Sequence, residues 1–285
     1  MGRRLFYGAG SSVAAFVIAA FAAAVLAAPG APRLADNSAK AIPVDVELVL
    51  AVDVSYSMDP DEQALQREGY RVALTSKEFL QALRQGANGK IAITYIEWAS
   101  EYDQKIVMPW RLIDGPEAAD AVSAELGAAP YRRASRTSIS GGLRFAKTLF
   151  DNSGYKGLRR VIDVSGDGAN NNGPLVAPMR DEVVAAGITI NGLPIMLKRA
   201  FVGSMDIEHL DWYYEDCVIG GPGAFVVPIR ERDQFIEATR TKLVLEIAGR
   251  QPEPRVQRAS AASPRISCTI GETMWRKRWG DYDFR

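Results

Sequence analysis

The sequence contains one histidine, His209, and two cysteines, Cys217 and Cys268. This scarcity of imidazole and thiolate groups argues against zinc and copper sites, which depend on such ligands. A Ser-His-Asp triad would have to use His209, which lies in a polar segment. The sequence therefore does not favour a catalytic triad.

An excess of charge of either sign is also missing. Lys and Arg number 34, Asp and Glu number 34, and no run of five or more basic residues occurs. Nucleic acids and anionic lipid surfaces attract proteins mainly through a basic excess. We therefore expect neither of them as a partner.

Long apolar stretches are limited to one, residues 12–28, which is rich in alanine and follows Arg3 and Arg4. A basic start, an apolar middle and a small-residue end are typical of a secretory signal peptide, here residues 1–28. The apolar stretch is near the length of an uncleaved membrane anchor. The paired arginines also resemble the core of a twin-arginine signal, although such pairs are common. We expect an exported protein, periplasmic or extracellular, or held at the inner membrane by this anchor.

Export would allow Cys217 and Cys268 to form a disulfide, and each has only the other as a partner within the chain. The bridge would close a loop of about 50 residues and contribute about 2–4 kcal/mol. It would hold the C-terminal tail, residues 250–285, to the domain. Two buried or free thiols remain the alternative, because the sequence does not give the distance between the two Cα atoms.

Apolar periodicity and turn residues divide the chain into a linker at 29–42, one domain at 43–249, and the tail. Predicted strands cover 44–53, 91–98, 104–110, 160–164, 188–196 and 224–229, with 104–110 at an edge. Predicted helices cover 60–84, 115–126, 138–150, 174–186, 205–216 and 233–247. The alternation of strands and helices predicts an α/β fold: a Rossmann-like, open, mostly parallel sheet with helices on both faces.

Three loops that follow predicted strands or precede a predicted helix are rich in oxygen donors. Asp53, Ser55 and Ser57 follow the first strand, Thr137 precedes the helix at 138–150, and Asp167 follows the strand at 160–164. In an open parallel sheet, loops at the carboxyl ends of the strands form the ligand crevice. We therefore expect these oxygen donors to converge, although capping of helices and loops is the simpler role for each one.

The order and spacing of these five residues resemble the metal-ion-dependent adhesion site of the von Willebrand factor type A domain. The resemblance covers about residues 44–248, and the segments 216–225 and 242–246 resemble a bacterial branch of uncharacterised function. One departure concerns the third loop, where the family usually has Thr-Asp-Gly and this chain has Gly166 before the aspartate. That threonine is not a direct metal ligand in the family.

The resemblance implies a metal site in which Ser55, Ser57 and Thr137 contact the ion directly or through water. Asp53 and Asp167 would act largely through water or from behind the other ligands. Oxygen-only donors favour Mg²⁺ or Mn²⁺. Neutral hydroxyl ligands leave the ion able to attract an anionic oxygen, and in the family a partner's carboxylate completes the coordination. The sequence thus predicts a binding protein that captures an acidic group of a protein partner, and not an enzyme.

Two alternatives remain open at this point. A metal-assisted hydrolase would need a general base beside the ion, and Glu97 is the carboxylate available for it. A metal-free structural protein of the cell envelope could instead be held to its neighbours by the tail. That tail is aromatic and basic, with Trp275, Trp279, Tyr282 and Phe284 beside Arg276, Lys277 and Arg278. The asparagines 170–172 could line the site, but a polar turn is the simpler interpretation.

Overall fold

The computed structural model describes residues 40–198, 205–249 and 264–280. The strands in these ranges form one sheet of order β3-β2-β1-β4-β5. They are β1 (Ile42–Asp53), β2 (Ile91–Trp98), β3 (Gln104–Ile113), β4 (Tyr155–Gly166) and β5 (Thr189–Pro194). β3 is antiparallel to β2 and lies at an edge, and the other pairs are parallel. The predicted fold class is confirmed, and the predicted signal segment lies outside the described residues.

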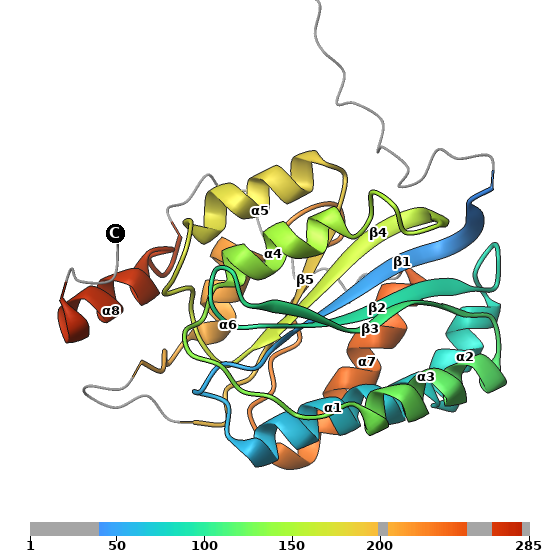
Figure 1. The fold of residues 1–285 in the computed structure, drawn as a ribbon, viewed down its shortest axis with the longest axis horizontal. Coiled ribbons are helices and arrows are strands. Elements are labelled where there is room, and N and C mark those ends of the chain that lie inside the picture. The colour runs from blue at the N-terminus through green and yellow to red at the C-terminus, as the bar shows by residue number, and fades with distance from the viewer. Residues whose placement is uncertain (1–39, 199–204, 250–263, 281–285) are drawn as a thin grey trace, which may run out of the picture. The chain divides into compact units, whose positions relative to one another are not determined.

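Helices cover both faces of the sheet (Figure 1). They are α1 (Pro60–Leu74), α2 (Lys77–Arg84), α3 (Pro116–Ala128), α4 (Ile139–Thr148), α5 (Val176–Ala185), α6 (Leu210–Tyr213), α7 (Phe235–Ala248) and α8 (Ile270–Trp279), with a π-helical turn η1 (Tyr214–Val218) and a 3₁₀ turn η2 (Arg232–Gln234). α1, α2, α3 and α7 pack on one face, and α4, α5, α6 and η1 on the other. Within the described ranges, no helix is long and apolar enough to cross a membrane.

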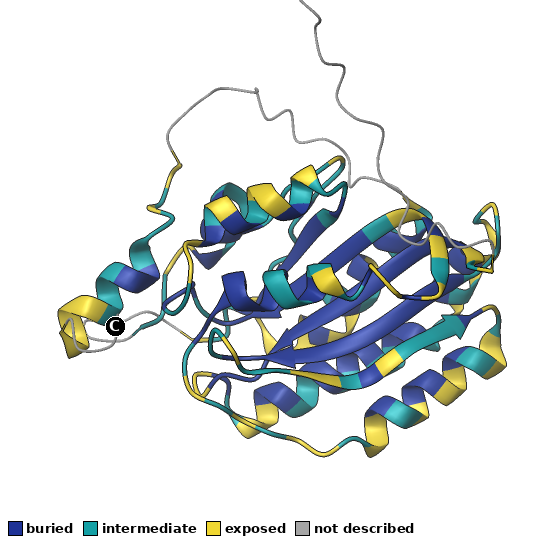
Figure 2. Cartoon of the chain, turned by 45° about the horizontal axis from the view of Figure 1, so that its top comes forward, coloured by how far each residue is buried: buried dark blue, intermediate teal, exposed yellow. Residues whose placement is uncertain are grey.

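The central strand β1 explains why the sheet is covered on both sides. Leu48 and Leu50 belong to the apolar core formed with α1 and α7, whereas Val49 and Ala51 belong to the core formed with α4 and α5. Alternate side chains of a strand point to opposite faces, so a strand that is apolar at every position needs two covering layers. Figure 2 shows the resulting buried centre of the sheet.

The single helix predicted at 60–84 is two helices. Ser76 ends the first, because its hydroxyl donates to the carbonyl of Ala73 at 2.7 Å. The same hydroxyl accepts from the N–H of Phe79 at 3.2 Å and so caps α2. A serine that bonds to the backbone in this way competes with helix continuation. The apolar pattern continues across the break, which is why the sequence suggested one helix.

The strand predicted at 224–229 does not form a regular ladder, and this prediction was wrong. The segment lies along β5, where the N–H of Gly192 donates to the carbonyl of Phe225 at 3.0 Å, but only isolated bridges result. In this parallel arrangement the next donor, facing Val227, would be the N–H of residue 194. Pro194 has no N–H, so the ladder is interrupted at that point.

The ends of the domain also differ from the sequence-based boundaries. β1 begins at Ile42, one residue inside the predicted linker. The segment 205–216, which was predicted to hold a short helix, contains the short α6 followed by η1. No element was predicted in the tail, yet α8 forms there. The helix was not predicted because only a few of its positions contact the domain, and these leave no clear apolar period in the sequence.

A disulfide joins Cys217, in η1, to Cys268, just before α8. The two Cα atoms are 5.4 Å apart, within the range that a disulfide can span. Cys217 itself is fully buried in the core formed with α4 and α5. The bridge therefore ties α8 to the body of the domain.

Three charged side chains are completely buried between the sheet and α7. The ammonium of Lys242 lies 2.5 Å from Oδ1 of Asp163 and 2.6 Å from Oε1 of Glu246. Asn191 donates to the same oxygen of Glu246 at 3.0 Å. Burial raises the pKa of Glu246 to about 7, with a further contribution from Asp163 and opposition from Lys242. The ionisation of Glu246 therefore contributes a pH-dependent term to the free energy of unfolding.

Glu246 is expected to make the free energy of unfolding fall as the pH rises from about 4.5 to about 7. Between its ordinary pKa of 4.5 and its raised value, the folded state holds a proton that the unfolded chain has released. Folding is therefore favoured on the acid side of this window, by an amount on the order of 3 kcal/mol. Denaturant unfolding at several pH values measures this slope. Glu246→Gln should flatten it, and an unchanged slope in that variant would contradict the assignment.

Candidate metal site

The three oxygen-rich loops meet at the carboxyl edge of the sheet, where β1 and β4 lie side by side. Ser55, Ser57, Thr137 and Asp167 line one cavity of about 220 Å³. Asp53 does not line it and lies underneath, fully buried at the end of β1. The structure thus brings all five candidate residues to one place, four around the cavity and one below it.

Asp53 is held in a fixed position, and one of its oxygens lacks a partner. Its Oδ1 accepts a hydrogen bond of 2.7 Å from the N–H of Ser55. Its Oδ2 is buried and has no hydrogen-bond partner among the described residues. Burial, and then the nearby charge of Asp167, raise the pKa of Asp53 well above its ordinary value. A cation or its bound water would satisfy this oxygen and favour the ionised form.

A chain of hydrogen bonds connects the first loop to the third. The hydroxyls of Ser55 and Ser57 are 2.7 Å apart, and Ser57 donates to Oδ1 of Asp167 at 2.6 Å. This contact spans 110 positions of sequence. The two hydroxyl oxygens keep lone pairs that can face the cavity, as oxygen ligands of a hard cation require.

The loop that carries Thr137 is braced by the asparagines that follow Asp167. The N–H of Thr137 donates to Oδ1 of Asn171 at 3.0 Å, and the N–H of Asn171 donates to the carbonyl of Thr137 at 2.8 Å. Asn170 accepts from the N–H of Ser140 at 3.0 Å. The asparagine run is therefore a clamp between two site loops, a role that the interpretation as a polar turn missed.

The departure from the family pattern at Gly166 has a steric reason. A Cβ atom at this position would lie 2.8 Å from Oδ2 of Asp53 and 3.1 Å from the hydroxyl of Tyr214. Tyr214 is fully buried in η1, and burial, followed by the charges of Asp53 and Asp167, raises its pKa well above the ordinary value. The ring of Tyr214 thus takes space beneath the site that a side chain at position 166 would need.

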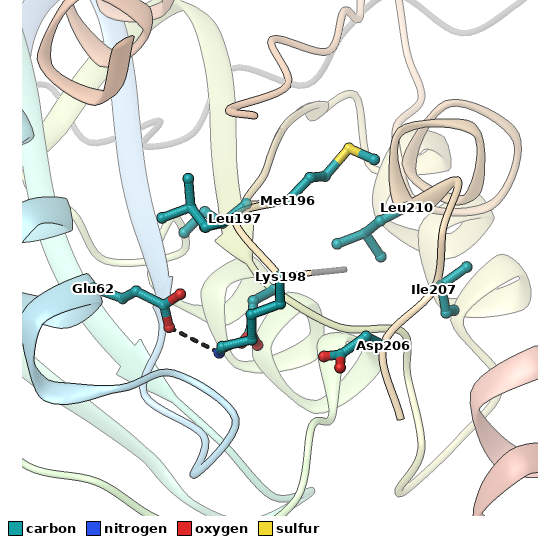
Figure 3. A pocket seen from close by; sticks show the side chains of 9 residues that line it. Glu62, Met196, Leu197, Lys198, Asp206, Ile207 and Leu210 are labelled. Atoms are coloured by element: carbon teal, nitrogen blue, oxygen red, sulfur yellow. Dashed lines mark hydrogen bonds and ion pairs between the residues drawn. The ribbon is translucent and has the colours of Figure 1, made fainter. Parts of the chain in front are cut away.

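Sequence reasoning missed a lysine next to the site, Lys198, whose ion pair with Glu62 is drawn in Figure 3. The ammonium of Lys198 is 2.9 Å from Oδ2 of Asp167 and 2.8 Å from Oε2 of Glu62, and it donates to the carbonyl of Ser57. The two carboxylates raise the pKa of Lys198, although partial burial works in the opposite direction. Lys198 follows β5 at the same edge of the sheet, so the rule that located the other loops could have found it. Asp206 also lines the cavity.

The residues present fit a hard divalent cation. The five candidate residues offer three hydroxyls and two carboxylates. Within the described ranges, no group of three or more His, Cys, Asp or Glu side chains could hold a metal. A set of hydroxyls and carboxylates suits Mg²⁺ or Mn²⁺ better than zinc or copper. The unpartnered oxygen of Asp53 and the cationic Lys198 beside Asp167 both show that this place favours positive charge.

Two residues weighed for catalysis lie elsewhere. The carboxylate of Glu97 is buried and paired with Arg67 at 2.7 Å and with Arg132 at 3.0 Å. Burial raises the pKa of Glu97, and these two arginines oppose the increase. His209 stacks on Trp212 with ring centroids 3.9 Å apart. Neither Glu97 nor His209 lines the cavity that contains the candidate ligands.

Lys198→Met is expected to increase the affinity for Mg²⁺ about tenfold, a change of about 1.4 kcal/mol. The substitution keeps the length of the side chain but removes a positive charge next to Asp167, which would repel a bound divalent ion. Isothermal titration calorimetry on the purified protein measures the affinity. Lys147→Met, which removes an exposed lysine paired with Glu182, serves as the control and should leave it unchanged. An unchanged or weaker affinity in Lys198→Met would contradict the expectation.

Comparison with known families gives a match over residues 43–251 to a family model described as "Protein of unknown function (DUF1194)". This region contains the whole predicted domain, residues 43–249, and covers most of the chain. The chain belongs to the DUF1194 family. No curated protein matches the sequence.

The fold of this DUF1194 protein is a von Willebrand factor type A-like α/β fold, and several solved structures share it. Proximal thread matrix protein 1 from the mussel byssus aligns with a TM-score of 0.52, 12% identity and 74% coverage of this chain. The pilus adhesin SpaC from Lactobacillus rhamnosus GG aligns with a TM-score of 0.50, 16% identity and 72% coverage. A von Willebrand factor type A protein from Catenulispora acidiphila aligns with a TM-score of 0.48, 14% identity and 72% coverage.

These similarities cover only parts of the other proteins. The matched region makes up 49% of the mussel protein, 30% of the adhesin and 43% of the protein from Catenulispora. A second structure of the mussel protein, with 16% identity to this chain and a TM-score of 0.50, has a zinc-occupied MIDAS motif. At these identities the comparison establishes the fold and leaves ligands and partners to be argued from the residues.

Proposed function

We propose that this DUF1194 protein is an exported binding protein that holds Mg²⁺ or Mn²⁺ and uses the ion to capture an acidic group of a protein partner. The observation that carries the proposal is the convergence of Ser55, Ser57, Thr137 and Asp167 around one cavity, above the unpartnered oxygen of Asp53. Export is proposed from the basic and apolar pattern of residues 1–28.

Each residue has a distinct part in this function. Ser55, Ser57 and Thr137 would offer neutral hydroxyl oxygens, and Asp53 and Asp167 would supply the negative charge that holds the cation. When bound, the ion supplies a Lewis-acidic position for a carboxylate oxygen. Because three of the five groups are uncharged, the ion keeps enough positive charge to attract a further anion. The clamp between Asn171 and Thr137 keeps the loops in place for this step.

The relatives are compatible with this proposal without deciding it. The mussel protein, whose MIDAS motif has been described with zinc, shares the fold, as does a pilus adhesin. The hydrolase alternative loses its proposed base, because Glu97 is paired with two arginines away from the cavity. In the metal-free alternative, the ammonium of Lys198 takes the place of the metal ion as the counter-charge of Asp167. The calorimetric titration of Lys198→Met with Mg²⁺ tests this alternative.

A chelator-dependent capture experiment tests the proposed function. Immobilised protein is incubated with an extract of the cell envelope in Mg²⁺ or Mn²⁺, and bound proteins are eluted with EDTA. We expect an acidic partner to be retained with the metal, released by the chelator, and absent when Asp167→Asn is used as bait. Absence of Mg²⁺ and Mn²⁺ binding by calorimetry, or retention that ignores EDTA, would refute the proposal.

A further inference from the structure

A continuous stack of cationic and aromatic side chains starts at the metal-site cavity and follows α8. The guanidinium of Arg136 lies 3.5 Å from the ring centroid of Trp275, and both residues line the cavity. The ring of Trp275 stacks on that of Trp279 at 5.7 Å, with 29° between the planes. The guanidinium of Arg278 lies 5.4 Å from the centroid of Trp279. The series of stacked side chains, in the order Arg136, Trp275, Trp279 and Arg278, thus leads away from the cavity.

The helix that carries this stack is fixed to the domain by independent contacts. The disulfide from Cys217 holds Cys268, which lies just before α8. The buried Glu272 accepts from Asn170 at 2.8 Å. Gly271 packs so closely that a Cβ atom there would lie 2.1 Å from the carbonyl oxygen of Asn170. α8 is therefore a fixed wall beside the cavity.

The backbone of Arg136 supports the view that this wall is part of the site. Its φ of 75° is the only positive value for a residue other than glycine in the described part of the chain. Arginine rarely adopts this conformation, and such residues often occur at functional sites. Arg136 precedes the candidate ligand Thr137, so the contact with Trp275 couples α8 to a loop of the metal site.

Basic side chains lie next to two aromatic residues that line the cavity, Trp275 and Tyr56. Beyond Trp275, the exposed residues Arg276, Lys277 and Arg278 form a basic run on α8. The guanidinium of Arg133 lies 5.5 Å from the ring centroid of the exposed Tyr56 and donates to the backbone carbonyl of Tyr56 at 2.6 Å. A guanidinium stacked on a ring still has N–H groups at its edge, which suit a carboxylate. The surface around the cavity is thus complementary to more than one acidic group.

We infer that the partner's binding segment is an acidic peptide with several carboxylates, of which one binds the metal and the next ones lie along the Arg136–Trp275–Trp279–Arg278 stack. This inference rests on the proposed function. α8 has 10 residues and is about 15 Å long, which matches four or five residues of an extended peptide. The stack acts as a second recognition element that distinguishes an acidic segment from an isolated Asp or Glu.

Two synthetic peptides test the inference on the full chain in saturating Mg²⁺ at low ionic strength. One contains a single carboxylate (acetyl-Gly-Asp-Gly-amide), and the other contains four (acetyl-Gly-Asp-Glu-Glu-Glu-Gly-amide). We expect the second peptide to bind at least tenfold more tightly, with a stronger decrease in affinity on adding salt. The triple variant Arg276→Gln, Lys277→Gln, Arg278→Gln should lose most of this gain while its affinity for Mg²⁺ and for the first peptide stays the same.

Arg240→Gln is the matched control, because it removes a half-buried basic residue of α7 on the other face of the sheet. It should leave the gain intact. A second variant, Cys217→Ser with Cys268→Ser, should reduce the gain if release of α8 separates the stack from the metal. Thermal melting of each variant verifies that the domain is folded.

The outcomes separate the two proposals. If Mg²⁺ does not bind, or EDTA does not weaken the single-carboxylate peptide, the proposed function fails. The inference about the stack is overturned if the metal binds but the four-carboxylate peptide binds no more tightly than the single-carboxylate peptide. It is also overturned if the triple variant keeps the full difference in affinity between the two peptides. Vesicles containing phosphatidylserine form a further arm. Binding to them through α8 without any peptide gain would assign the stack to a lipid surface and overturn the inference.

Discussion

Replacing Asp167 by asparagine is expected to weaken Mg²⁺ binding by about 10–100-fold, the usual cost of losing a group that supports a metal site. Asparagine keeps an oxygen that can accept from Ser57 but lacks the negative charge. That charge lies beside the buried Asp53, and the two together give the cavity its attraction for a cation. Isothermal titration calorimetry measures the change, and Ser57→Ala provides a second variant of the same site.

The stability of the metal-free protein separates a loss of the ligand from a loss of the fold. In the metal-free protein the charge of Asp167 is opposed by Asp53 but is paired with the ammonium of Lys198 at 2.9 Å. Because these two effects oppose each other, Asp167→Asn should melt close to the temperature of the parent protein. Asp181→Asn, which alters an exposed carboxylate paired with Arg180, should change neither quantity. Normal Mg²⁺ affinity in Asp167→Asn would show that this aspartate takes no part in the site.

Replacing Lys242 by methionine is expected to lower the free energy of unfolding by about 3–5 kcal/mol, the range for removing one partner of a buried ion pair. Lys242 is the cation beside Asp163 and Glu246, and all three side chains are completely shielded from solvent. Methionine fills similar space but leaves two carboxylates without their counter-charge. Denaturant unfolding near neutral pH measures the loss.

The pH dependence of this destabilisation tests its electrostatic origin. Without the ammonium of Lys242, the buried carboxylates can avoid the penalty only by taking up protons. The loss should therefore be small near pH 5 and should increase towards pH 8. Lys147→Met, in an exposed pair, should cost less than about 1 kcal/mol at every pH. A loss in Lys242→Met that is independent of pH would point to packing as the cause.

Two buried groups of charges in this domain differ in how they are compensated. The carboxylates of Asp163 and Glu246 share the ammonium of Lys242 in the interior. The buried carboxylate of Asp53 lies near the charge of Asp167 and has no lysine or arginine in contact with it among the described residues. A buried carboxylate without a counter-charge of its own favours a cation beside it.

Much of the fold followed from local patterns in the sequence. The apolar run of β1 predicted helices on both faces of the sheet, and the alternation of strands and helices predicted parallel pairing of the strands. The helix predicted to begin at residue 60 does begin there as α1, where Asp59 and Glu62 form both hydrogen bonds of a capping box. The prediction that three loops converge used only the rule that the carboxyl ends of parallel strands share an edge.

What the sequence could not determine depends on contacts between residues far apart in the chain. Lys198 reaches Glu62 and Asp167, and Tyr214 takes space beside Gly166, because separate elements pack at one edge of the sheet. The position of α8 beside the cavity depends on a disulfide and on the contact of Trp275 with Arg136. Sequence periodicity reports which face of an element is apolar, and it contains no information on which distant side chain will meet it. The sequence by itself therefore determined the sheet and the oxygen donors of the site. Only the tertiary structure decided that Lys198 and the aromatic side chains of α8 lie beside these donors.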